Sequence, residues 1–222
     1  MARPDTERPV RDLRMSRRCL TGRIALSAGG NAAFESSLER DWLIALDFDP
    51  TVVSIRVQPF SIQYEDDGRR RRYTPDILAE AVLPNGRRVT TVYEVKPLDE
   101  LRSDWCSYRA RFKAAVRHCR AQGWRFKIVT EREIRTPYVV NAKFLRRYRT
   151  IPEQIYTAQQ LAYTLKALGE TTPQALLAAA YLTDEKRMAA LPELWRLVSI
   201  RQVSAILTEP LTMRSPIWLP AG

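Results

Sequence analysis

The sequence predicts an α/β domain in which helices flank a mixed sheet, followed by a small helical, winged-helix-like C-terminal domain. Three observations lead to this prediction. Helical and extended patterns alternate through the first 150 residues, the composition then shifts to Ala, Leu and Thr, and the charge changes at the same place. We therefore expect a basic arm at residues 1–30, an α/β domain at 31–150 and a helical domain at 151–222.

The charge of the chain is strongly positive and unevenly distributed. Its net charge is +11, and its isoelectric point is about 9.9. Lys and Arg outnumber Asp and Glu by 4 in residues 1–30 and by 7 in residues 31–150, whereas residues 151–222 are balanced. A positive field of this kind favours a polyanionic partner. The first 150 residues are therefore predicted to bind nucleic acid, and the neutral tail is expected to have another role.

Several classes of protein are excluded by composition. Three cysteines without a C-x-x-C spacing and a single histidine are too few for a zinc site. The longest apolar run, residues 175–182, is far shorter than the roughly 18 residues that span a bilayer. Arg17-Arg18 is not followed by an apolar signal region, because Arg23 interrupts it. We expect a cytoplasmic protein with reduced thiols and no membrane attachment.

The α/β domain is predicted to begin with a helix and two extended segments. Apolar residues recur at helical spacing in residues 32–46, and Asp49-Pro50 should end that helix. Residues 52–57 and 60–64 are apolar-rich and favour extended chain. A turn at residues 65–68 then lies beside a run of four arginines, namely Arg69, Arg70, Arg71 and Arg72.

The rest of the domain is predicted to contain a hairpin, a long helix, a strand and a basic helix. Pro84-Asn85-Gly86 is a strong hairpin signal between two extended segments. In chain order, the predicted elements are strands at residues 73–83 and 89–96, a helix at 99–123, a strand at 126–130 and a helix at 141–149. The C-terminal domain is predicted to contain helices at residues 157–168, 172–182, 191–197 and 200–207, and extended chain at 213–219.

The predicted hairpin brings three charged residues together. Side chains alternate along a strand, so Glu94 and Lys96 point to one side while Val95 points into the core. Asp76 lies on the neighbouring strand. Two carboxylates there can hold Mg²⁺, and Lys96 can orient or deprotonate an attacking water. The pattern predicts phosphodiester hydrolysis, whereas an isolated Glu-x-Lys triplet is usually a solvated pair.

Four ordered motifs resemble a known family. They are Phe34-Glu35-Ser36-Ser37-Leu38-Glu39-Arg40-Asp41, Gln58-Pro59-Phe60, Tyr73-Thr74-Pro75-Asp76 and Glu94-Val95-Lys96-Pro97. Over residues 18–149 the chain resembles the TnsA-type endonuclease subunit of heteromeric, Tn7-like bacterial transposons, and the helical tail is more weakly similar to that family's C-terminal domain.

The resemblance implies a restriction-endonuclease-like fold and Mg²⁺-dependent cleavage of the 5′ strand of double-stranded DNA at transposon ends. It also implies an integrase-type transposase that cuts the 3′ strands, and an ATPase regulator that docks on the C-terminal domain. The resemblance assigns catalytic roles to Glu39, Asp76 and Lys96, and Glu94 is the fourth predicted catalytic residue. The predicted metal site comprises Glu39, Asp76, Glu94 and Val95, and an all-oxygen site also accepts Mn²⁺.

Some alternatives remain open at this stage. Glu35 lies on the same helical face as Glu39 and could serve the site in its place. A stand-alone restriction or junction-resolving nuclease, or an inactive DNA-binding module with a nuclease fold, would share much of the pattern. The predicted DNA contacts are the four arginines Arg69 to Arg72 and, on the polar face of the long helix, Arg109, Lys113 and Arg117.

Overall fold

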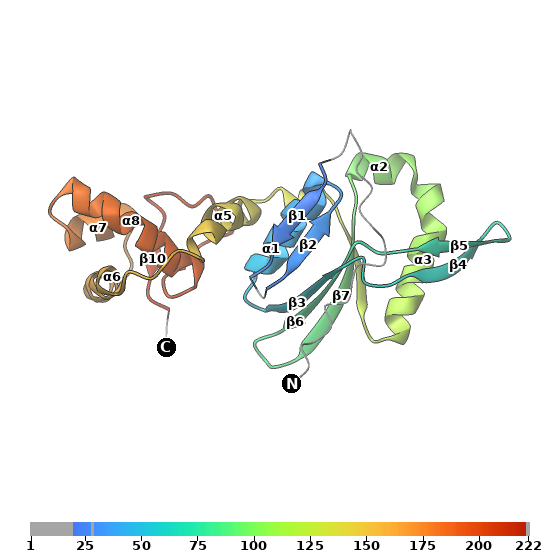
Figure 1. The fold of residues 1–222 in the computed structure, drawn as a ribbon, viewed down its shortest axis with the longest axis horizontal. Helices are drawn as coiled ribbons and strands as arrows, with labels where there is room; N and C mark the ends of the chain where they lie inside the picture. The colour runs from blue at the N-terminus through green and yellow to red at the C-terminus, as the bar shows by residue number, and fades with distance from the viewer. Residues whose placement is uncertain (1–19, 28, 221–222) are drawn as a thin grey trace. The chain divides into compact units, whose positions relative to one another are not determined.

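The computed structural model describes residues 20–27 and 29–220 and divides into two compact units, Met1–Ile134 and Arg135–Gly222. Most of the predicted basic arm, residues 1–19 and 28, lies outside the described residues. The described part of the arm contains a strand, β1 (Gly22–Ala25), that pairs antiparallel with β2 (Asn31–Phe34) (Figure 1).

Helix α1 (Ser37–Phe48) starts later than the predicted 32–46, because residues 31–34 belong to β2. Ser36 caps the helix, and its Oγ accepts a 3.1 Å hydrogen bond from the backbone N–H of Glu39. This Ser-x-x-Glu arrangement is an N-terminal signature that marks the true start. The helix ends at Asp49, as predicted.

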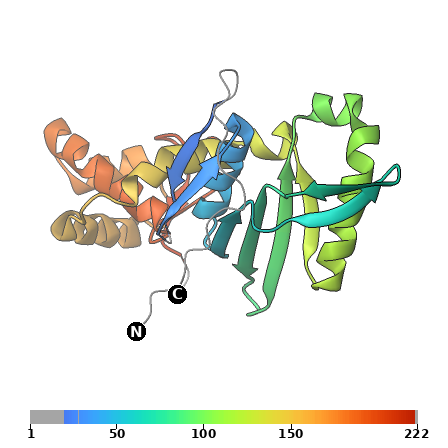
Figure 2. The same cartoon turned by 45° about the vertical axis from the view of Figure 1, so that its right-hand side comes forward.

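The central sheet of the first unit has the strand order β3-β6-β7-β8. Its strands are β3 (Val52–Val57), β6 (Ile77–Val82), β7 (Arg88–Val95) and β8 (Arg125–Val129). The pairs β3–β6 and β6–β7 are antiparallel, and β7–β8 is parallel, so the sheet is mixed as predicted. In Figure 2, β8 lies at the edge of the sheet, beside a long helix.

A separate two-stranded hairpin consists of β4 (Ile62–Asp66) and β5 (Arg69–Tyr73). Its turn is Asp67-Gly68, where both residues have positive φ, 50° and 71°, which suits a tight hairpin turn and favours glycine. The four arginines therefore form a strand, and Tyr73 ends that strand instead of starting the predicted strand 73–83. Asp76 immediately precedes β6, which begins at Ile77.

Helices cover both faces of the central sheet. The predicted helix 99–123 is two helices, α2 (Leu98–Ser103) and α3 (Trp105–Ala121), separated at Asp104. Helix α3 packs on the face that carries Val92, whereas Trp42 of α1 contacts Tyr93 on the other face with ring centroids 5.4 Å apart. A short helix, α4 (Glu131–Ile134), ends the unit.

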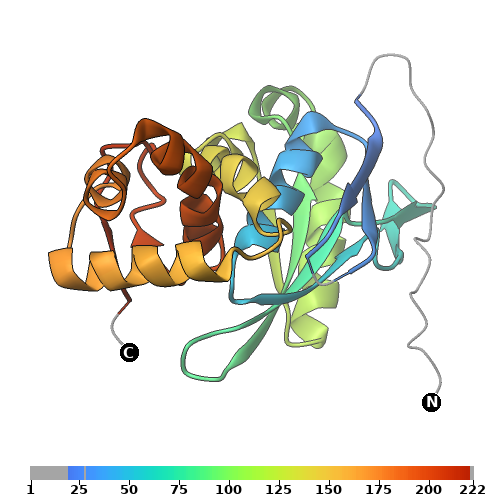
Figure 3. The same ribbon diagram turned by 60° about the vertical axis from the view of Figure 1, so that its left-hand side comes forward.

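The second unit is mainly helical (Figure 3). It contains α5 (Pro137–Leu145), the 3₁₀ helix η1 (Arg146–Tyr148), α6 (Ile155–Leu168), α7 (Pro173–Ala180), α8 (Asp184–Ser199), β9 (Ser204–Ala205) and β10 (Ile217–Trp218). The predicted helix 200–207 is wrong, because β9 pairs with β10 there. None of the described helices is long and apolar enough to cross a membrane.

The boundary between the units falls after Ile134 and not at the predicted residue 150. Helix α5 packs within the second unit, where Phe144 meets Trp195 with ring centroids 5.3 Å apart. The buried side chain of Asn141 donates to the carbonyls of Leu207 and Glu209, at 2.9 and 2.7 Å. These contacts join α5 to the helical unit.

Candidate active site

The β6–β7 hairpin brings Asp76, Glu94 and Lys96 to one end of the central sheet. Ile77 pairs with Tyr93, so Asp76, just before β6, lies beside Glu94 near the end of β7. The backbone N–H of Val95 donates a 2.7 Å hydrogen bond to Oδ2 of Asp76, which fixes this carboxylate against the neighbouring strand.

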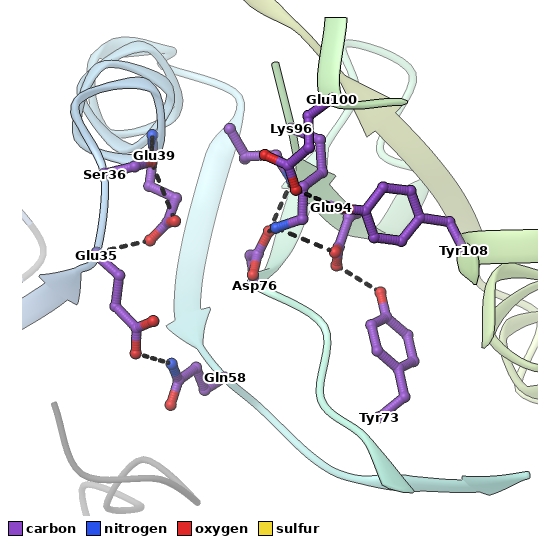
Figure 4. Close-up of polar contacts among 11 residues, drawn as sticks. Glu35, Ser36, Glu39, Gln58, Tyr73, Asp76, Glu94, Lys96, Glu100 and Tyr108 are labelled. Atoms are coloured by element: carbon purple, nitrogen blue, oxygen red, sulfur yellow. Dashed lines mark hydrogen bonds and ion pairs between the residues drawn. The ribbon is translucent and has the colours of Figure 1, made fainter. Parts of the chain in front are cut away.

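Lys96 lies between the two carboxylates (Figure 4). Its Nζ is 3.9 Å from Oδ2 of Asp76 and 3.4 Å from Oε1 of Glu94. Burial lowers the pKa of Lys96, but the charges of Asp76 and Glu94 outweigh that effect and raise it. In this arrangement Lys96 is an ammonium donor, which favours an orienting role over deprotonation of water.

Glu94 is the most enclosed acid of the group, with 2% of its surface exposed. Its Oε2 accepts a 2.5 Å hydrogen bond from the hydroxyl of Tyr73, at the end of β5. Burial, followed by the charge of Asp76, raises the pKa of Glu94 to about 7. Burial also raises the pKa of Asp76. Carboxyls with strongly raised pKa values cluster at functional sites in proteins.

Glu39 and Glu35 approach the same space from the start of α1. Glu39 accepts from the backbone N–H of Glu35 at 2.8 Å and from Oγ of Ser36 at 3.1 Å, and burial raises its pKa to about 7, with a further contribution from Asp76. Glu35 accepts a 3.1 Å hydrogen bond from Nε2 of Gln58. Both residues line the cavity.

These groups surround a polar cavity of about 430 Å³. Its walls come from α1, from the segment before β4, from the end of β5, from the β6–β7 strand ends and from α3. The predicted catalytic residues Glu39, Asp76, Glu94 and Lys96 all line it. The structure thus gathers the predicted set around one cavity.

The sequence prediction gave no site role to four residues that line this cavity, Gln58, Tyr73, Thr74 and Arg111. Arg111 lies on α3 with its guanidinium carbon 4.0 Å from the ring centroid of Tyr108. Within the described part of the chain it forms no ion pair, and its buried Nε has no hydrogen-bond partner. Arg111 lies one turn after Tyr108, on the partly buried face of α3. This position in the sequence distinguishes it from the exposed basic residues of the same helix.

The donors in the cavity suit a hard divalent cation. Asp76 and Glu94 both lie within 4 Å of the ammonium nitrogen of Lys96, so the two carboxylates face the same part of the cavity. Mg²⁺ is commonly held by one or two carboxylates and water. Val95, with a buried apolar side chain, can offer only its carbonyl oxygen. Among residues 20–27 and 29–220, no three acidic, His or Cys side chains already form a metal cluster.

The predicted DNA contacts fall into two groups. Arg69, Arg70, Arg71 and Arg72 are exposed on β5, where Arg72 lines the cavity and Arg71 pairs with Asp66 at 3.0 Å. The second group, Arg109, Lys113 and Arg117, is exposed on α3 but lines a different cavity. Of the predicted DNA contacts, Arg72 is therefore the one that lines the cavity with the carboxylates.

A mixed sheet flanked by helices, with acidic residues and a lysine at the ends of two adjacent strands, is consistent with a nuclease-like α/β fold. Residues 49–131 match the family described as TnsA-like endonuclease N terminal. This match confirms the resemblance predicted from the sequence and supports a TnsA-type subunit. The matched segment includes Asp76, Glu94 and Lys96, and Glu39 precedes it. A search of curated proteins found no match.

Proposed function

We propose that this protein is the DNA endonuclease subunit of a Tn7-type cut-and-paste transposase, and that it hydrolyses the 5′ strand at each transposon end. The observation that carries the proposal is the shared position of Lys96 between Asp76 and Glu94, in a cavity within the TnsA-like domain. An ion-paired lysine and two acids at a strand end supply what hydrolysis of a phosphodiester needs.

Asp76, Glu94 and the carbonyl of Val95 would hold Mg²⁺ or Mn²⁺, with Glu39 as a further acidic ligand from α1. When bound, the cation would polarise a phosphoryl oxygen and make an attacking water more acidic. Burial, followed by the charge of Asp76, raises the pKa values of Glu39 and Glu94 to about 7, and these values support the proposal because a bound divalent cation would stabilise the charged carboxylates.

The cationic side chains of the cavity have separate proposed roles. Lys96 orients the attacking water and remains an ammonium ion between its two carboxylates. Arg111, stacked on Tyr108, is placed to donate to the scissile phosphate as negative charge develops on it. Because the stacking already orders the guanidinium, little conformational entropy is lost when phosphate binds.

Double-stranded DNA is proposed to approach along the β4–β5 hairpin. Arg69 to Arg72 project as an exposed basic strand, and Arg72 reaches the cavity itself. Contacts from such residues to phosphates position the backbone without reading its sequence.

The second unit is proposed to bind protein partners, namely the ATPase regulator and, together with the nuclease domain, the integrase-type transposase. Residues 151–222 of this unit carry no net charge, which disfavours a phosphate-binding role for that part, whereas residues 135–150 add five basic residues and no acidic one. The element order of this unit supports the winged-helix-like prediction. Helix α6 is followed by a β-bridge between Thr171 and Ile217, then by α7, α8 and the β9–β10 pair of strands. A cytoplasmic location would suit this assembly.

The proposal is tested by incubating transposon-end DNA, labelled on either strand, with the purified chain alone and with the transposase and ATPase. We expect 5′-strand nicks with Mg²⁺ or Mn²⁺ when the partners are present, little cleavage with Ca²⁺, and none in excess chelator. Efficient cleavage by the chain alone would favour a stand-alone nuclease. An absence of cleavage under every condition, with DNA binding retained, would favour an inactive DNA-binding module.

A further inference from the structure

A second cavity of about 570 Å³ lies in the first unit, between α3 and the edge strand β8. Its floor is apolar, formed by Trp105, Phe112, Val116, Phe126 and Ile128. Trp105 is 48% exposed, which is high for so large an apolar side chain. We call this cavity the α3–β8 groove.

The rim of the α3–β8 groove is basic. It carries four exposed residues of α3, namely Arg109, Lys113, Arg117 and Arg120. None of the four forms an ion pair with any residue in the described ranges. An apolar floor with a rim of unpaired cations complements a ligand that is both apolar and acidic.

The α3–β8 groove is distinct from the nuclease cavity. The two share no lining residue. Arg111, which lines the nuclease cavity, is two positions from Arg109 and from Lys113, or about 200° around the helix axis. The two basic faces of α3 thus point in nearly opposite directions, and a phosphate held at Asp76 lies on the other side of the helix from the groove.

Beside the α3–β8 groove, the edge strand β8 can pair with the backbone of a further strand. In the described sheet, β8 pairs with β7 alone, so its second edge remains available for a further strand. Phe126 and Ile128 point into the groove, and the alternate residues Arg125 and Lys127 are exposed. A strand added beside β8 would place every second side chain over the apolar floor.

We propose that the α3–β8 groove binds an extended segment of a partner protein in which apolar and acidic residues alternate, added as a strand to β8. The apolar side chains of that segment pack on Trp105 and Phe126, and its carboxylates pair with the cations of α3. Duplex DNA would use the cations but leave the apolar floor in contact with water, so a peptide fits the groove better. This binding is independent of the nuclease chemistry.

The test uses the full-length chain and a short fluorescein-labelled peptide that alternates Val or Leu with Asp or Glu. The matched probes are a scrambled peptide that clusters the same residues, a peptide with Lys in place of the acids, and a labelled DNA duplex. The variants are Trp105→Ala and Arg120→Glu, with Arg87→Glu in the exposed β6–β7 turn as the control of equal charge change.

We expect the alternating acidic peptide to bind at least about tenfold more tightly than the scrambled and basic peptides. Trp105→Ala and Arg120→Glu should each weaken that binding about tenfold, while Arg87→Glu changes it less than about twofold. Bound peptide should slow amide exchange in Arg125–Val129. Amide exchange also reports whether each variant remains folded.

Three results would overturn the proposal. The first is equal affinity for the acidic, scrambled and basic peptides. In the second, Arg120→Glu weakens duplex binding and leaves peptide binding unchanged, which would assign the groove to DNA. In the third, the chain self-associates and Trp105→Ala abolishes that association, which would assign the groove to a second copy of this protein.

Discussion

The hydroxyl of Tyr73 donates a buried 2.5 Å hydrogen bond to Oε2 of Glu94, whose other carboxylate oxygen lies 3.4 Å from Nζ of Lys96. Glu94 is therefore oriented from two sides, by the neutral hydroxyl of Tyr73 on the β4–β5 hairpin and by the ammonium group of Lys96, just after β7. The hairpin that carries the four arginines is thus connected to the orientation of a proposed metal ligand.

Tyr73→Phe should slow DNA cleavage about tenfold with little loss of DNA affinity. The variant removes only the hydroxyl, so the ring keeps its packing against Ile62 and Ala115, while Oε2 of Glu94 loses its donor at a cost of roughly 1–3 kcal/mol. Single-turnover cleavage and duplex binding measured side by side would check this. A wild-type cleavage rate would show that the hydrogen bond does not orient Glu94.

Arg111→Ala should lower the single-turnover cleavage rate about tenfold to a hundredfold and change duplex affinity much less, because its guanidinium acts at one phosphate. Arg111→Lys should restore only part of the rate, since an ammonium cannot stack on Tyr108 as the planar guanidinium does. Arg87→Ala, in an exposed turn, is the matched control. Equal effects of Arg111→Ala and Arg87→Ala on the rate would contradict a specific role.

The stability of the metal-free protein should fall as the pH rises from about 4.5 to about 7. Glu39 and Glu94 have ordinary pKa values of 4.5 and folded-state pKa values of about 7, so over this interval the folded chain binds more protons than the unfolded chain. In Glu94→Gln, the loss of unfolding free energy over this pH interval should be smaller by on the order of 1 kcal/mol. Urea unfolding in chelator tests this, and identical profiles for the variant and the wild type would refute it.

A chain ended after Ile134 should be more soluble than one ended after residue 150. The longer truncation keeps α5 but removes α8 and the segment after it, so Phe144 loses Trp195 and Asn141 loses its backbone partners. Apolar surface exposed in this way promotes aggregation. Sedimentation and thermal unfolding of both truncations would compare them, and equal behaviour would place the boundary closer to residue 150.

The core of the candidate site could be predicted from the sequence because it depends on local rules. Strand alternation, a Pro-Asn-Gly turn and the spacing from Asp76 to Glu94 are enough to place these two acids and Lys96 together. The family match supports the same segment.

The remaining features depend on tertiary contacts that no local pattern encodes. The role of Arg111 depends on which face of α3 meets the cavity, and its exposed neighbours Arg109 and Lys113 have the same residue chemistry. The sequence predicts a helix from residue 32, yet residues 31–34 form a strand because β1 pairs with them. Helix α5 joins the second unit because the side chain of Asn141 donates to the carbonyls of Leu207 and Glu209.

The most direct test of the account is 5′-strand cleavage by purified Asp76→Ala and Lys96→Ala, measured with the transposase and ATPase present and beside duplex binding. Both variants should lose 5′ cleavage by at least about a thousandfold. They should keep DNA affinity within about threefold, because that affinity comes from a dispersed basic surface. Cleavage of the 3′ strand by the transposase should continue in both reactions. A wild-type rate of 5′ cleavage in either variant would contradict the assignment of this cavity as the nuclease site.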